Sequence, residues 1–142
     1  ALAAVATWLD RRYRVRFSGL VLAQYRNERD SLGFHRDTGM TWVDDTLVAV
    51  LSLGAQRPWY LRPDRGRPID GFDDDLRDVI DIAPAGGDLL VMGGACQRTW
   101  LHAVPPVAGA VGNRISAQWR WTSRRGEPDQ SLPHRDAWRF SR

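Results

Sequence analysis

Two side chains in the first third of the chain have the types and spacing of metal ligands. His35 and Asp37 are separated by one residue in the stretch of residues 33–37, and alternate side chains of a β-strand point to the same face. The chain has only three histidines, His35, His102 and His134, and His102 lies in another strand-like stretch. Two imidazoles and one carboxylate on one side of an ion are typical of mononuclear non-haem Fe(II) oxygenases. By itself, however, the pair also fits a solvated surface turn.

A second polar group lies in the strand-like stretch of residues 113–121. Alternation gives this stretch a polar face, formed by Arg114, Ser116, Gln118 and Arg120, and an apolar face, formed by Ile115, Ala117, Trp119 and Trp121. We expect the apolar face to pack outward against a helix or loop and the polar face to point toward the metal. Buried guanidiniums need anions, and we expect Asp37 to be unavailable because the metal takes it. A dicarboxylate co-substrate would satisfy both arginines; the alternative is an edge strand with two solvated arginines.

Short strands must position these side chains. Apolar residues at helical spacing predict one helix at residues 1–12. Turn residues then separate about eight predicted strands, at residues 17–25, 33–37, 46–53, 59–62, 78–82, 88–92, 100–104 and 113–121. This pattern is typical of a mainly β fold with a flanking helix. A double-stranded β-helix, or jelly roll, would bring His35, Asp37 and His102 together at one mouth.

Composition places the chain among single-domain globular proteins. It has 142 residues, of which 43% are hydrophobic, a formal net charge of +3, and no lysine among its 20 basic residues. The single cysteine excludes an internal disulfide and fits a reducing compartment. We find no membrane-spanning apolar run and no signal peptide, so we expect a soluble cytoplasmic protein. We also expect a monomer, with no stable protein partner evident from the sequence. We expect one catalytic domain at residues 1–121 and a polar tail with little regular structure at residues 122–142.

With these residues in view, the chain resembles the AlkB family of Fe(II)- and 2-oxoglutarate-dependent dioxygenases over residues 20–121. The resemblance is carried by short motifs: Tyr25 and the loop after it, residues 32–37, 51–54 and 87–92, His102, and the Arg-x5-Arg pair of Arg114 and Arg120. It implies three iron ligands, which are His35, Asp37 and His102. It also implies a 2-oxoglutarate site, formed by Tyr25, Arg114, Ser116 and Arg120.

The resemblance further implies a reaction and its partners. Members of the family use Fe(II), 2-oxoglutarate and O2 to demethylate alkylated DNA or RNA bases in DNA repair, with release of formaldehyde, succinate and CO2. Three positions depart from the family pattern, because Ala23 and Ser116 stand in place of asparagines and Gly39 in place of an acidic residue that reads the damaged base. The family's nucleotide-gripping lid lies upstream of the shared core, and we expect most of it to be missing from this chain.

A few further side chains are candidates for contacts with nucleic acid. Trp100 is predicted to line the pocket or the core, and Trp42 to stack on a base or pack within its loop. Four arginines near one loop fit either phosphate contacts or a solvated face, of which we favour the solvated face; they are Arg57, Arg62, Arg65 and Arg67. Three other functions stay open: an oxygenase acting on protein or a small molecule, a non-catalytic jelly-roll binding module, and a zinc hydrolase.

Overall fold

The computed structural model describes residues 1–37, 40, 45–66 and 76–123. This part of the chain contains two helices, α1 (Leu2–Tyr13) and α2 (Cys96–Thr99). Its strands are β1 (Val21–Tyr25), β2 (Leu32–His35), β3 (Thr46–Gly54), β4 (Tyr60–Pro63), β5 (Ile80–Asp81), β6 (Leu89–Gly94), β7 (Trp100–Val104) and β8 (Arg114–Thr122). Among the described residues, no helix has the length and apolar character that crossing a membrane requires.

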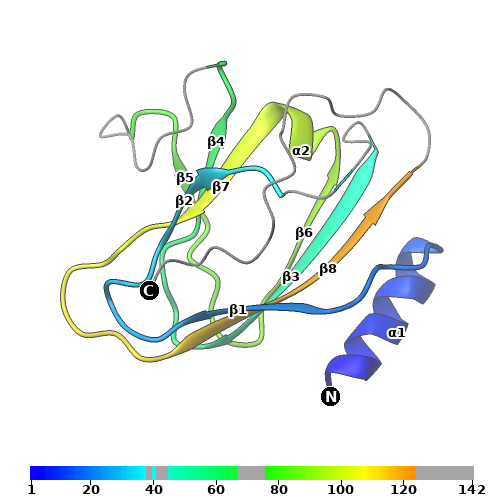
Figure 1. Cartoon of the computed structure of the whole chain (residues 1–142), viewed down its shortest axis with the longest axis horizontal. Helices are drawn as coiled ribbons and strands as arrows, with labels where there is room; N and C mark the ends of the chain where they lie inside the picture. Colours follow the sequence, from blue (N-terminus) through cyan, green and yellow to red (C-terminus); the bar gives the residue numbers. More distant parts are fainter. Residues whose placement is uncertain (38–39, 41–44, 67–75, 124–142) are drawn as a thin grey trace.

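The strands form two antiparallel four-stranded sheets, which we call the major sheet and the minor sheet. The strand order is β1-β8-β3-β6 in the major sheet and β2-β7-β4-β5 in the minor sheet. The chain passes back and forth between the sheets, because β1, β3, β6 and β8 belong to one and β2, β4, β5 and β7 to the other. Figure 1 shows α1 outside the sheets, beside β8. This connectivity is that of a double-stranded β-helix, so the predicted jelly roll with a flanking helix is confirmed.

The major sheet buries both of its faces. Val48 and Val50 of β3 point into the interior between the sheets, where they pack with Trp59, Met92 and other buried residues. Ala49, between them, points to the opposite face. On that face the apolar side chains of β8 pack against α1, in a cluster that includes Leu9, Phe17, Ala117 and Trp119. The predicted outward apolar face of β8 is therefore confirmed, and its polar face is directed inward.

Several element boundaries differ from the sequence-based prediction. The strand expected at residues 17–25 begins only at Val21, because Phe17 turns aside to pack with α1, its ring 6.2 Å from that of Tyr13. The strand expected at 78–82 is reduced to Ile80–Asp81. The metal-bearing strand expected at 33–37 ends at His35, and α2 was not predicted. Residues 124–142 of the expected tail lie outside the described part of the chain.

Gly54 fixes the end of β3 next to Arg114. Its φ angle is +86°, a conformation that residues with a side chain rarely adopt. A Cβ placed there would lie 2.3 Å from the backbone oxygen of Asn113. The close approach is needed because Gly54 pairs with Arg114 in the register of β3 and β8. Glycine at this position therefore lets β8 begin at the residue that carries the buried guanidinium.

Candidate metal centre

The three side chains expected to bind metal converge in the structure. The potential ligand atoms of His35, Asp37 and His102 all lie within 4.8 Å of one another. His35 and His102 are direct partners in the register of β2 and β7, and their ring centroids are 4.2 Å apart. Asp37 follows the end of β2 and is 5% exposed. Two imidazoles and a carboxylate within this span form a facial set suited to Fe(II).

Both imidazoles are held in the form that a metal requires. The Nδ1 of His35 lies 2.8 Å from the backbone oxygen of Gly33, so a proton on Nδ1 is donated there and Nε2 is left as the ligand. Burial lowers the pKa of His35, and burial together with the neighbouring His35 lowers the pKa of His102 to about 3. Both rings are therefore neutral near pH 7 and keep a lone pair for an ion. Trp59 stacks on His102 with a centroid distance of 5.4 Å and an interplanar angle of 14°.

Asp37 is oriented by two partners and keeps one oxygen free for an ion. Its backbone N–H donates to Oε1 of Gln97 at 3.0 Å, and its Oδ1 accepts from Nη2 of Arg120 at 2.7 Å. Its Oδ2 is buried and has no hydrogen-bond partner among the described residues. Burial opposes ionisation, but the neighbouring His102 ring and the Arg120 guanidinium, which also donates a hydrogen bond, outweigh it and lower the pKa of Asp37. A buried anion with one unpaired oxygen is what a metal ligand should present.

The ion pair between Arg120 and Asp37 corrects one expectation. From the sequence we expected Asp37 to be unavailable and Arg120 to bind a dicarboxylate. In the structure Arg120 donates both to Asp37 and, at 2.8 Å, to Oε1 of Gln118. A carboxylate has two oxygens, so Asp37 can serve Arg120 with one and a metal with the other. The expectation that Asp37 is unavailable was wrong because it assigned the whole carboxylate to the metal. The role of Arg120 toward the co-substrate stays a prediction.

Arg114 forms a second polar centre in the interior of the jelly roll. It is 0% exposed, and Nη2 donates to Oγ of Ser52 at 2.9 Å. Its Nε and Nη1 are buried without a hydrogen-bond partner among the described residues. Burial lowers the pKa of Arg114, as expected for a cation without a counter-charge. These unused donors fit the carboxylate of 2-oxoglutarate, for which a forked guanidinium is the usual partner.

Tyr25 and Ser116 lie next to this guanidinium. Tyr25 pairs with Arg114 in the register of β1 and β8, and its ring centroid is 5.6 Å from the Arg114 Cζ. Burial raises the pKa of Tyr25, so its hydroxyl stays protonated and can donate to an anion. Ser116 is 1% exposed and lies between Ala23 and Ser52 in the sheet register. The structure thus brings Tyr25, Arg114 and Ser116 together, whereas Arg120 lies with the metal ligands.

Arg57 is buried, contrary to the solvated face that we favoured for it from the sequence. It is 1% exposed and donates to three backbone oxygens, those of Asn27 at 2.8 Å, Asp30 at 2.9 Å and Pro105 at 3.0 Å. Its Cζ also lies 5.5 Å from the ring centroid of Tyr25. Arg57 therefore ties two loops together beside Tyr25. It has no phosphate-binding role in this position, because its donors are turned inward.

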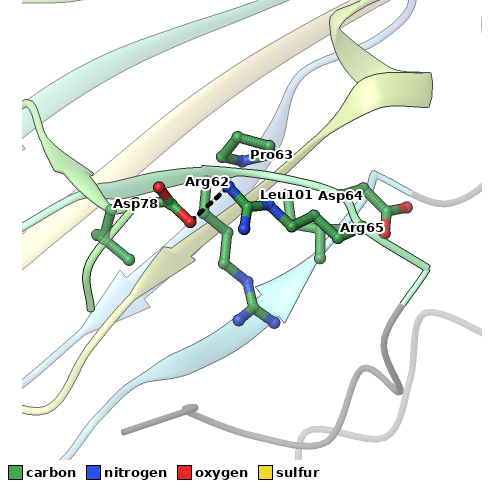
Figure 2. A pocket seen from close by; sticks show the side chains of 7 residues that line it. Arg62, Pro63, Asp64, Arg65, Asp78 and Leu101 are labelled. Atoms are coloured by element: carbon green, nitrogen blue, oxygen red, sulfur yellow. Dashed lines mark ion pairs between the residues drawn. The ribbon is translucent and has the colours of Figure 1, made fainter. Parts of the chain in front are cut away.

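Arg62 and Arg65, two other members of that arginine group, lie near the minor sheet. Figure 2 shows Arg65 paired with Asp78, at 2.6 Å, and the side chain of Arg62 extending away from this pair. The guanidinium of Arg62 lies 4.1 Å from the ring centroid of Phe34. The pocket in Figure 2 has a volume of about 20 Å³ and is lined partly by Leu101, whose neighbour His102 points to the opposite face. It is large enough for about one water molecule and does not open on the metal site.

Some of the expected contact residues cannot be placed. Arg67, Trp42 and Gly39 lie outside the described residues. Trp100, the first residue of β7, is partly exposed.

Trp59 and Gln97 are neighbours of the expected metal ligands that sequence reasoning missed. Neither has a sequence signal of its own, since Trp59 precedes a strand and Gln97 lies on a helix of four residues.

The fold and the site define a class of protein, and comparison with known families agrees with it. A sequence model of the 2OG-Fe(II) oxygenase superfamily matches residues 6–133. The superfamily description names an Fe(II) ion and 2-oxoglutarate. The metal triad fits the ion, and the buried cation of Arg114 fits the acid. Both parts of the site therefore have the residues that this class requires.

Sequence identity to individual proteins indicates a narrower family within this superfamily. The chain is 34% identical over 104 residues to the alpha-ketoglutarate-dependent dioxygenase alkB homolog 3 of Bos taurus, which covers 73% of this chain and 36% of the relative. It is 32% identical over 114 residues to the Homo sapiens protein of the same name, covering 79% and 40%. It is 30% identical over 129 residues to the DNA oxidative demethylase ALKBH2 of Arabidopsis thaliana, covering 79% and 41%. The chain belongs to the AlkB family of 2OG-Fe(II) oxygenases, and it spans about two fifths of the length of these relatives.

Proposed function

We propose that this protein is an Fe(II)- and 2-oxoglutarate-dependent dioxygenase that removes methyl groups from alkylated bases of DNA or RNA. The observation that carries the proposal is the pairing of two centres in one interior. A His-Asp-His triad with an unpaired carboxylate oxygen lies on one side, and a fully buried guanidinium with two unused nitrogens lies on the other. The names of the relatives, which include a DNA oxidative demethylase, support nucleic acid as the substrate class.

Each group of residues has a defined task in this reaction. His35, Asp37 and His102 would hold Fe(II), which supplies O2 activation and C–H oxidation when it is bound. Arg114 and the Tyr25 hydroxyl would bind the far carboxylate of 2-oxoglutarate. Trp59 shields His102 from water on one face of its ring. The protein contributes mainly orientation and a dry interior, and no acid–base side chain is required.

The reaction balances with O2, 2-oxoglutarate and the methylated base as substrates. One oxygen atom of O2 enters the co-substrate, which loses CO2 and becomes succinate, so the co-substrate supplies two electrons. The other oxygen atom is inserted into a C–H bond of the methyl group, which converts N–CH3 to N–CH2OH. This product breaks at the C–N bond, with its hydroxyl proton moving to nitrogen. Formaldehyde and the unmodified base result.

The experiment that tests the proposal measures three products in one mixture. The protein is incubated with Fe(II), 2-oxoglutarate and air, together with an oligonucleotide that carries a methyl group on a base nitrogen. We expect equal amounts of formaldehyde and succinate, and an oligonucleotide lighter by one CH2 in its mass spectrum. The same oligonucleotide is offered as single-stranded DNA, duplex DNA and RNA, and a methylated peptide is offered in parallel.

Two variants make the outcome decisive. His102→Ala removes a ligand and is expected to abolish all products, whereas Gln56→Ala changes an exposed side chain that donates to the Ala83 oxygen and is expected to behave as the parent. Succinate without demethylated oligonucleotide would support an oxygenase with a different substrate, and formaldehyde from the peptide would identify a protein substrate. Absence of succinate under every condition would favour a non-catalytic module.

A further inference from the structure

The position of Asp37 is not explained by the strands that carry the other two ligands. His35 and His102 face each other in the ladder between β2 and β7. Asp37 lies two residues beyond the end of β2, where that ladder provides no partner. The preceding pairing is also irregular, with a register shift between Leu32 and His35. A ligand outside regular structure needs another contact to hold its backbone.

Gln97 provides that contact. Its Oε1 accepts the backbone N–H of Asp37 at 3.0 Å. Gln97 is 1% exposed, so water does not compete for this hydrogen bond. Its Nε2 faces Sδ of Met92 at 3.8 Å, and a thioether is a weak acceptor. The bond to Asp37 is therefore the stronger of the two contacts made by the amide group.

We propose that Gln97 is a positioning residue for the metal site, holding Asp37 where a ladder partner would otherwise hold it. Gln97 lies on α2, which leads directly into β7 and His102. Its hydrogen bond thus connects the segment that carries Asp37 to the element that carries His102. Together with Arg120 on Oδ1, it fixes Asp37 at its backbone and at its carboxylate, and it leaves Oδ2 directed to the ion. The inference rests on the metal site of the proposed function and assigns that site a further residue.

The test uses Co(II), which binds such sites without consuming O2 or co-substrate. Gln97→Met keeps the length of the side chain but removes the acceptor oxygen. We expect it to raise the dissociation constant for Co(II) about tenfold or more, as removal of outer partners of metal ligands does, and to alter the visible spectrum of the Co(II)-saturated protein. Gln97→Glu keeps an acceptor at the same place and is expected to restore both the affinity and the spectrum.

Two controls separate positioning from general loss of stability. Gln56→Met makes the same substitution at an exposed site, and Leu9→Ala weakens the core on the far side of the major sheet. Both are expected to bind Co(II) as the parent does, although Leu9→Ala melts at a lower temperature. If Gln97→Met does not fold, Gln97→Asn replaces it, because its acceptor is drawn back by about 1.5 Å, one C–C bond.

The possible outcomes have distinct meanings. Normal Co(II) affinity and spectrum in Gln97→Met would overturn the inference and leave the metal site intact. Equal weakening in Gln97→Met and Leu9→Ala would also overturn it, because the effect would then be one of stability. A parent protein that does not bind Co(II) would overturn both the metal site and the role of Gln97.

Discussion

At the scale of single residues, the site is built from charges that the fold leaves incompletely paired. Arg114 and Asp37 are both buried, and each keeps polar atoms without a partner among the described residues. An incompletely paired buried charge destabilises a protein by several kcal/mol unless a ligand completes it. Arg114 can bind an anion, and Asp37 can bind a cation. The first centre is therefore complementary to an acid and the second to a metal ion. The two side chains destabilise the free protein because their unpaired atoms are kept for these ligands.

The first prediction concerns that cost at Arg114. Replacement by methionine removes a buried cation, so we expect the free energy of unfolding of the free protein to stay equal or to rise by about 1 kcal/mol or more. With Co(II) present, 2-oxoglutarate at 100 times its dissociation constant should stabilise the parent by about 2.7 kcal/mol but leave Arg114→Met unchanged. Urea unfolding with and without 2-oxoglutarate measures both effects.

The control for this prediction is Arg29→Met, because Arg29 has an exposed side chain and only a 3.8 Å contact with Glu28. It should respond to 2-oxoglutarate as the parent does. A marked loss of stability in the free Arg114→Met protein would mean that the guanidinium has a structural role. Retained stabilisation by 2-oxoglutarate would place the co-substrate elsewhere.

The second prediction concerns Arg57, whose three backbone acceptors make it structural. Arg57→Met leaves buried carbonyl oxygens of two loops without a donor, and we expect a loss of about 2–4 kcal/mol of unfolding free energy. Arg65→Met removes an exposed ion pair and should cost less than about 1 kcal/mol. Thermal or urea unfolding of the two variants compares them directly. Equal effects would contradict the buried role of Arg57.

Arg57 also shows why part of the site could not be predicted. The expected iron ligands and Arg114 were singled out by residue type and spacing. The structure brings the three expected ligands within 4.8 Å of one another and buries Arg114. The partners of Arg57 are backbone oxygens of two loops distant in the sequence, and nothing in the types of those residues marks them as acceptors. Trp59 and Gln97 were missed for the same reason. Contacts that depend on tertiary geometry leave no local pattern to find.

At the scale of elements, the alternation of side chains predicted which face of a strand is buried better than it predicted where the strand ends. In β8 the alternation correctly separated Arg114 and Ser116 from Ala117 and Trp119. In β2 the same rule placed Asp37 on the strand, but the strand ends at His35. A face is set by repeated burial of many side chains, whereas an end depends on a few hydrogen bonds. The ligand still reaches the metal site because Gln97 and Arg120 hold it there.

The third prediction tests the end of β3. Gly54→Ala requires a Cβ at a positive φ angle and 2.3 Å from the Asn113 oxygen, so we expect a loss of about 2 kcal/mol or more. Because Gly54 pairs with Arg114, we also expect weaker binding of 2-oxoglutarate. Gly19→Ala is the matched control, since its Cβ would meet nothing within 4 Å, and it should change stability by less than about 1 kcal/mol. Similar stability of the two variants, measured by urea unfolding, would contradict the strain at Gly54.

At the scale of the whole molecule, the site joins the two sheets of the jelly roll. The metal ligands belong to the minor sheet or follow it, because His35 lies on β2 and His102 on β7. The residues proposed to bind the co-substrate belong to the major sheet, with Tyr25 on β1 and Arg114 on β8. Trp59 connects the two centres, since it stacks on His102 and packs in the same interior cluster as Tyr25. A molecule that bound both centres would hold the two sheets together.

The last prediction follows from this arrangement. If 2-oxoglutarate contacts both the metal and Arg114, each ligand should tighten the binding of the other by the same factor, because the coupling free energy is reciprocal. We expect a factor of about 10–100 from calorimetric titrations with Co(II) and 2-oxoglutarate in both orders. In His102→Ala the co-substrate can reach only the anchor on the major sheet, so its affinity should be low and independent of Co(II). Equal affinity for 2-oxoglutarate with and without Co(II) in the parent would mean that the two centres bind separately and that the sheets are joined by packing alone.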